Sequence, residues 1–132
     1  MIHRVLDVPA LTDMATGRTQ FIRARWHVAR EMSATLLVPW CAAAEACRLL
    51  RAGDRAVLLS ALAAPMVVVA PRDAASAVAC AGMTGAGGSA PGWDAAQVVH
   101  EAGRRGWPVV TSEQYLGRLL DVDPHLTFER LP

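Results

Sequence analysis

Residues 2–9 have the sequence IHRVLDVP, in which a strand-like apolar run ends in an acid, Asp7, shortly before a proline. We predict a first strand over Ile2–Val8 and a short helix over Leu11–Thr16, introduced by that proline. An aspartate directly after a buried strand has no obvious structural duty. Asp7 is therefore a candidate functional residue.

The alternation of strands and helices continues through the chain. We predict further strands over Thr35–Val38, Met66–Val69 and Pro108–Thr111, with an edge strand at Leu126–Phe128. The continuous β-branched run at Met66–Val69 is typical of a strand buried on both faces. Helices are expected at 19–33, 39–51, 55–63, from Asp73 onward, 93–105 and 112–120. This order predicts a three-layer α/β/α fold with a central, mainly parallel sheet.

The bulk composition limits the possible classes. With 132 residues, 53% of them hydrophobic, the chain suits one domain spanning residues 1–132. A net charge of +1 provides no overall attraction to nucleic acid or membranes, so any nucleic-acid site must be local. No apolar stretch reaches the ~20 residues that cross a bilayer, and Asp7 leaves no room for a signal peptide. We expect a cytoplasmic protein without a membrane segment.

The three cysteines lack C-x-x-C spacing and are odd in number. This pattern indicates buried free thiols rather than a disulfide framework or a zinc site.

Four acids occur where predicted strands end or just inside the helices that follow them: Asp7, Glu45, Asp94 and Glu113. Ligands of open α/β sheets bind outside the carboxyl ends of the strands, so these carboxylates can converge. Each crowded pair repels by about 4 kcal/mol at ~4 Å, and a hard divalent cation relieves that repulsion. The ordinary alternatives are a turn at Asp7, a helix cap at Asp94, and solvated glutamates.

Four motifs in this order resemble those of the PIN domain, a small α/β nuclease fold found in many bacterial toxin-antitoxin pairs. They are Val5–Asp7, Leu37–Glu45, Asp94–Ala102 and Pro108–Glu113. The resemblance implies an endoribonuclease that uses Mg²⁺ or Mn²⁺ to hydrolyse RNA phosphodiester bonds. The sequence departs from the family in having Glu113 where aspartate is usual, and Val-Pro where a small polar residue commonly follows the first aspartate.

We hypothesise that Asp7 and Asp94 bind the metal directly. Glu45 would complete the ligand set or hold a metal-bound water, and Glu113 would position a second metal or the water. The departures at Glu113 and after Asp7 support an alternative, in which a catalytically degenerate PIN fold serves as a binding or regulatory module.

Other polar residues are candidates for substrate contact. Thr111 and Ser112 could bond a carboxylate or a substrate phosphate, or could cap the last helix. Arg23 and Arg25 belong to the densest basic cluster and could contact RNA phosphates, or could form a solvated helical face.

The resemblance also implies partners, namely a homodimer and an antitoxin peptide bound in a groove. Such a groove requires an exposed apolar patch with Trp26 or Trp40, whereas both tryptophans could instead belong to the core.

Overall fold

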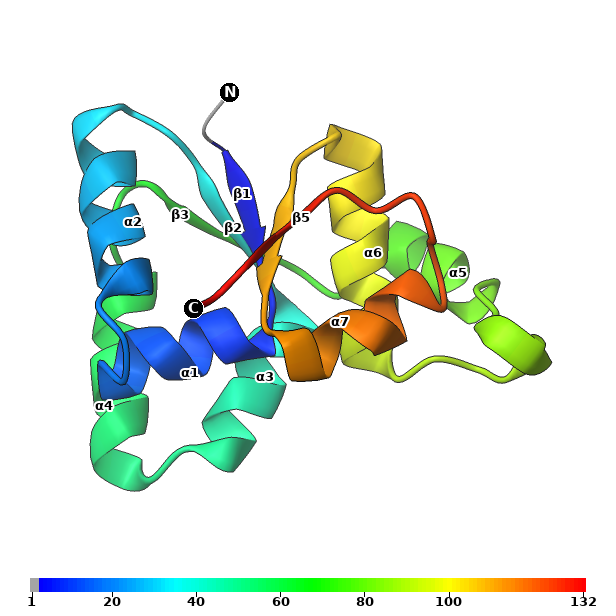
Figure 1. Ribbon diagram of the computed structural model, residues 1–132, viewed down its shortest axis with the longest axis horizontal. Coiled ribbons are helices and arrows are strands. Elements are labelled where there is room, and N and C mark those ends of the chain that lie inside the picture. Colours follow the sequence, from blue (N-terminus) through cyan, green and yellow to red (C-terminus); the bar gives the residue numbers. More distant parts are fainter. Residues whose placement is uncertain (1–2) are drawn as a thin grey trace.

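The computed structural model describes residues 3–132 and contains a five-stranded, fully parallel sheet with helices on both faces (Figure 1). The predicted three-layer α/β/α class is confirmed. The strand order is β3-β2-β1-β4-β5. The strands are β1 (Arg4–Leu6), β2 (Leu36–Pro39), β3 (Val67–Ala70), β4 (Val109–Thr111) and β5 (Phe128–Arg130).

Within the described residues, seven α-helices connect and flank these strands. They are α1 (Val8–Thr16), α2 (Phe21–Glu31), α3 (Trp40–Leu49), α4 (Ala52–Leu62), α5 (Ala74–Ala81), α6 (Trp93–Arg105) and α7 (Glu113–Leu120). In Figure 1, α2 and α4 lie on one side of the sheet, and α5 and α6 lie on the other. A short 3-10 turn, η1 (Ala86–Gly88), lies between α5 and α6.

The first strand is shorter than predicted. It ends at Leu6, and Val8 already belongs to α1, because Asp7 adopts an extended conformation at the N-cap and the proline occupies the first turn. The predicted start at Ile2 lies outside the described residues. Helix α1 ends at Gly17, whose φ of 66° is a left-handed conformation that glycine adopts without strain.

The prediction of a buried strand at Met66–Val69 is wrong in its burial. Strand β3 occurs at nearly these residues, but it is an edge strand, and Val68 is 47% exposed. A continuous β-branched run indicates extended structure, whereas burial depends on whether another layer covers the strand. The predicted edge strand near the C-terminus does form, two residues later, as β5.

The core lies between the sheet and its helices and contains the fully buried Leu6, Leu11, Ile22 and Leu37. Trp26 is also buried, so it belongs to the core and not to an exposed groove. The three cysteines are free, as predicted, but only Cys80 is buried, and the expected burial is wrong for Cys41 and Cys47, which are partly exposed. No helix within residues 3–132 combines the length and the apolar character needed to span a bilayer.

The strand order reverses between β1 and β4. From β1 the chain proceeds outward to β2 and β3, and it then returns to place β4 on the other side of β1. In open parallel sheets this switch point leaves a crevice at the carboxyl ends of the two strands. Asp7 follows β1 and Thr111 ends β4, so both residues lie at this position.

Candidate functional site at the switch point of the sheet

Asp7 is fully buried at the end of β1, and two other elements supply its partners. The Thr111 hydroxyl donates to Asp7 Oδ2 at 2.7 Å, and Arg118 Nη2 donates to Asp7 Oδ1 at 2.6 Å. The pKa of Asp7 is raised because burial penalises its charged form, although Arg118 and Thr111 oppose this effect. A carboxylate held in this way is oriented by its neighbours.

Asp94 joins the same cluster from the first turn of α6. Its Oδ2 atom lies 3.3 Å from Arg118 Nη2, the nitrogen that also contacts Asp7. Two carboxylates that are far apart in the sequence thus converge on one atom. The helix begins at Gly92 as N-cap, so Asp94 does not occupy the cap position.

Glu45 faces this region from α3. Its carboxylate pairs with Arg48, at 2.5 Å between Oε1 and Nη2, and this hydrogen bond is the main cause of its lowered pKa. The positive charge of Arg118 lowers the same pKa further. Glu45 also shares a cavity of about 350 Å³ with Asp94. We call it the acidic cavity after Glu45 and Asp94, although two arginines balance their charges. It is lined by Trp40, Cys41, Ala44, Glu45, Arg48, Arg72, Trp93 and Asp94.

Glu113 lies apart from the other three acids. It is the first residue of α7, its side chain is 75% exposed, and its carboxylate pairs with Arg130 Nη1 at 2.6 Å. It lines a different cavity, together with Ser112. Ser112 occupies the N-cap of α7 without a capping hydrogen bond from its side chain. The structure therefore brings Asp7, Asp94 and Glu45 to one region and leaves Glu113 outside it.

The two candidate RNA-binding arginines on α2 make structural contacts. Arg23 donates to the carbonyl oxygens of Met14 and Ala15 at the end of α1, where a cation is favoured by the helix dipole. Arg25 pairs with Glu129 of β5. A contact of either arginine with RNA stays a prediction.

Arg118 is the central residue that the sequence did not reveal. Its guanidinium stacks over the Tyr115 ring, 4.9 Å from the centroid, while Nη2 contacts the two aspartates. Its Nε and Nη1 atoms are buried and have no hydrogen-bond partner within residues 3–132. In the sequence, Arg118 looks like an ordinary solvated residue of a helix. Only its contact with Asp7 in the structure identifies it as part of the site.

The acids fit a divalent cation in donor type and in direction. Carboxylate oxygens are the ligands that Mg²⁺ prefers. One oxygen of Asp7 and one of Asp94 lie close to the same atom, Arg118 Nη2. Arg118 contacts these same oxygens, so it would compete with the cation. Within residues 3–132, no three His, Cys, Asp or Glu side chains are already grouped to hold a metal ion. A bound cation would therefore require Arg118 to withdraw and Glu45 to approach.

No family model and no curated protein matches this chain. The resemblance to PIN domains consequently stays a prediction carried by the four motifs.

The hydroxyl of Thr111 is expected to contribute about 1.5 kcal/mol to the free energy of unfolding. Replacing Thr111 with Val keeps the shape of the buried side chain but removes the donor to Asp7 Oδ2. Urea denaturation at neutral pH measures this loss. In a Thr35→Val control, no side-chain hydrogen bond to Asp7 is removed, and an equal loss there would contradict the assignment.

Proposed function

We propose that the protein is a metal-dependent endoribonuclease that binds its cation with Asp7 and Asp94 and uses Glu45 beside them. The observation that supports this most directly is the convergence of both aspartates on one point, at the switch point of the sheet. RNA is favoured over DNA as substrate by the resemblance to PIN domains alone. A cytoplasmic location belongs to the same proposal.

A bound Mg²⁺ or Mn²⁺ would activate the attacking water and neutralise the charge that grows on the phosphoryl oxygens. The protein's own residues orient the groups around that chemistry. Thr111 fixes the rotation of the Asp7 carboxylate, and the β1 and β4 strands hold both residues in register. Arg118 offsets part of the charge of the aspartates, and a cation that displaced it would free its guanidinium for a substrate phosphate.

A second candidate function is a degenerate PIN fold that binds without cleaving. One specific observation favours it, since Arg118 already pairs with both aspartates and Glu113 pairs with Arg130. In this case the guanidinium stands permanently in place of a cation, and the acidic cavity serves only as a binding surface.

The proposed partners are a second copy of the chain and an antitoxin peptide. Exposed apolar side chains on the outer helices support this part of the proposal, including Val28 and Met32 around the end of α2 and Leu59 on α4.

Metal binding by calorimetry tests the proposed function. We expect Mg²⁺ or Mn²⁺ to bind the wild type, and Asp94→Asn to weaken binding at least tenfold while the fold stays intact. Cleavage of a structured RNA panel in the same samples should disappear with the metal. No binding at millimolar metal in the wild type would refute the nuclease and leave the binding module.

A further inference from the structure

Two tryptophans border the acidic cavity, one from each helix that supplies an acid. Trp40 begins α3 and is 44% exposed, and Trp93 begins α6 and is 61% exposed. Tryptophan is seldom left this open unless its ring contacts a partner. Both tryptophans line the acidic cavity themselves, so they lie at the candidate site.

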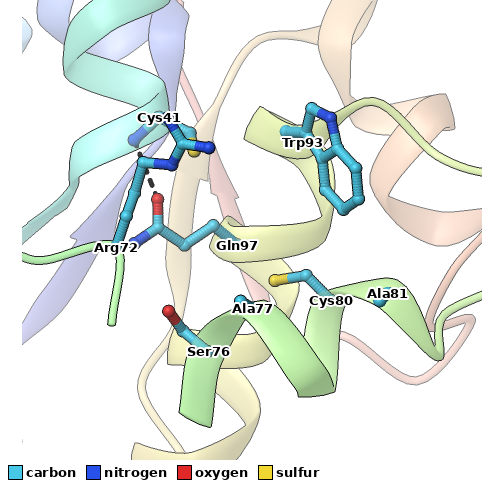
Figure 2. Close-up of a pocket in the computed structure, with 8 residues that line it drawn as sticks. All are labelled: Cys41, Arg72, Ser76, Ala77, Cys80, Ala81, Trp93 and Gln97. Carbon is cyan, nitrogen blue, oxygen red and sulfur yellow. Dashed lines mark hydrogen bonds between the residues drawn. The ribbon is translucent and has the colours of Figure 1, made fainter. Parts of the chain in front are cut away.

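A second cavity of about 330 Å³ opens beside the acidic one, and we call it the Trp93 recess. Figure 2 shows Trp93 on one side of it, and Ala77, Cys80 and Ala81 along α5 on another. Cys41, Arg72 and Trp93 line both cavities, so the recess and the acidic cavity adjoin. Its volume is within the range of small-molecule sites, and its walls are largely apolar.

Arg72 provides a positive charge at the edge of the recess. The guanidinium of Arg72 lies over the Trp40 ring, 5.1 Å from the centroid, at the boundary of the two cavities. Within the described part of the chain, Arg72 forms no ion pair with a carboxylate. An arginine that is held by an aromatic face and is not engaged in an ion pair can contact a phosphate.

The polar groups of the recess are already in use. The Gln97 amide nitrogen donates to the Ala70 and Pro71 carbonyls, and its oxygen accepts from the Cys41 amide (Figure 2). The Ser76 hydroxyl donates to the Asp73 carbonyl. The walls therefore offer stacking and shape but few hydrogen bonds, so they distinguish poorly between bases.

We infer that the Trp93 recess binds one unpaired nucleobase of single-stranded RNA, with the ring of Trp93 stacking on the base and Arg72 contacting a neighbouring phosphate. The choice of RNA rests on the proposed function. The adjoining acidic cavity then receives the backbone next to the bound base. Preference for unpaired strands and weak base selectivity follow from this arrangement, because a paired base cannot enter the recess.

The test measures binding without cleavage. A ten-nucleotide single-stranded oligouridylate is titrated in EDTA at fixed low salt, and affinity is read by fluorescence anisotropy of the labelled RNA. We expect Trp93→Ala to weaken binding about tenfold and Trp93→Phe to keep most of the affinity. Phe128→Ala is the matched control, because Phe128 is an exposed aromatic on β5 that lines neither cavity. Its affinity should equal that of the wild type.

Equal affinity of Trp93→Ala and wild type overturns the inference, as does equal binding of an RNA duplex of the same length. Absence of RNA binding also overturns it and points to an apolar peptide as occupant. The proposed function fails separately: RNA that binds through Trp93 but is never cut with Mg²⁺ supports the recess and refutes the nuclease. RNA cleavage that is unchanged by Trp93→Ala supports the nuclease and refutes the recess.

Discussion

Arg118→Met is expected to lower the free energy of unfolding by about 3 kcal/mol at neutral pH without added metal. The variant keeps an unbranched side chain over Tyr115 but leaves the buried Asp7 carboxylate without its cation. Arg118 is 28% exposed, so the loss falls at the lower end of that for buried pairs. Thermal unfolding should shift down by roughly 10 °C.

The stability deficit of Arg118→Met should increase as the pH rises from below 3.8 to neutral. Burial raises the folded-state pKa of Asp7 above its ordinary value of 3.8, so the folded protein binds more protons than the unfolded chain above pH 3.8. Stability contributed by Asp7 therefore falls as pH rises from 3.8 through the folded pKa. Arg118 opposes the rise in pKa, so its removal extends this window upward. The deficit should be smallest below pH 3.8, where Asp7 is protonated in both states, and should grow toward neutral pH.

Added metal should reduce the stability deficit of Arg118→Met. If a cation and the guanidinium compete for the same oxygens, Arg118→Met binds Mg²⁺ more tightly than the wild type. Its stability then rises with metal concentration, by about 2.7 kcal/mol at a hundred times the dissociation constant. Denaturation of both proteins across a Mg²⁺ series measures this linkage.

Arg130→Met is the matched control for these measurements. It removes the exposed pair with Glu113, in which both side chains are more than half exposed, so it should cost less than about 1 kcal/mol and show no metal linkage. An Arg118→Met variant as stable as Arg130→Met at neutral pH would refute the counter-ion role.

The second large effect is expected from the acids themselves. Asp7→Asn should reduce Mg²⁺-dependent RNA cleavage at least ~100-fold, because it removes one of the two carboxylate charges proposed to bind the cation. Glu113→Gln should stay within about threefold of the wild type, because Glu113 lies with Arg130 outside the cluster. Single-turnover cleavage of one RNA, with circular dichroism to verify the fold, compares the two variants.

Comparing Asp7→Asn with Glu113→Gln distinguishes a site of three acids from a site that also includes Glu113. Equal loss in both would mean that Glu113 moves into the cluster when substrate binds, as the four-acid hypothesis requires. No cleavage by any of the proteins, the wild type included, would favour the binding module over the nuclease.

The sequence predicted the α/β class and most element positions from local signals. Apolar runs, prolines and helix-ending glycines act within a few residues, so they indicate β1, α1 and α6 without tertiary information. The same signals misjudged the burial of β3, because burial depends on the neighbouring layer.

Some features of the candidate site were also predictable from the sequence, whereas others depend on the tertiary structure. The sequence by itself placed Asp7 and Thr111 at strand ends and Asp94 in the first turn of a helix, and parallel topology then suffices to gather them. Only the tertiary structure decided that Arg118 joins Asp7 and Asp94 while Glu113 turns to Arg130. The physical reason is that strand ends are fixed by backbone hydrogen bonding, whereas the direction of a side chain on α7 depends on how the whole helix packs against the sheet.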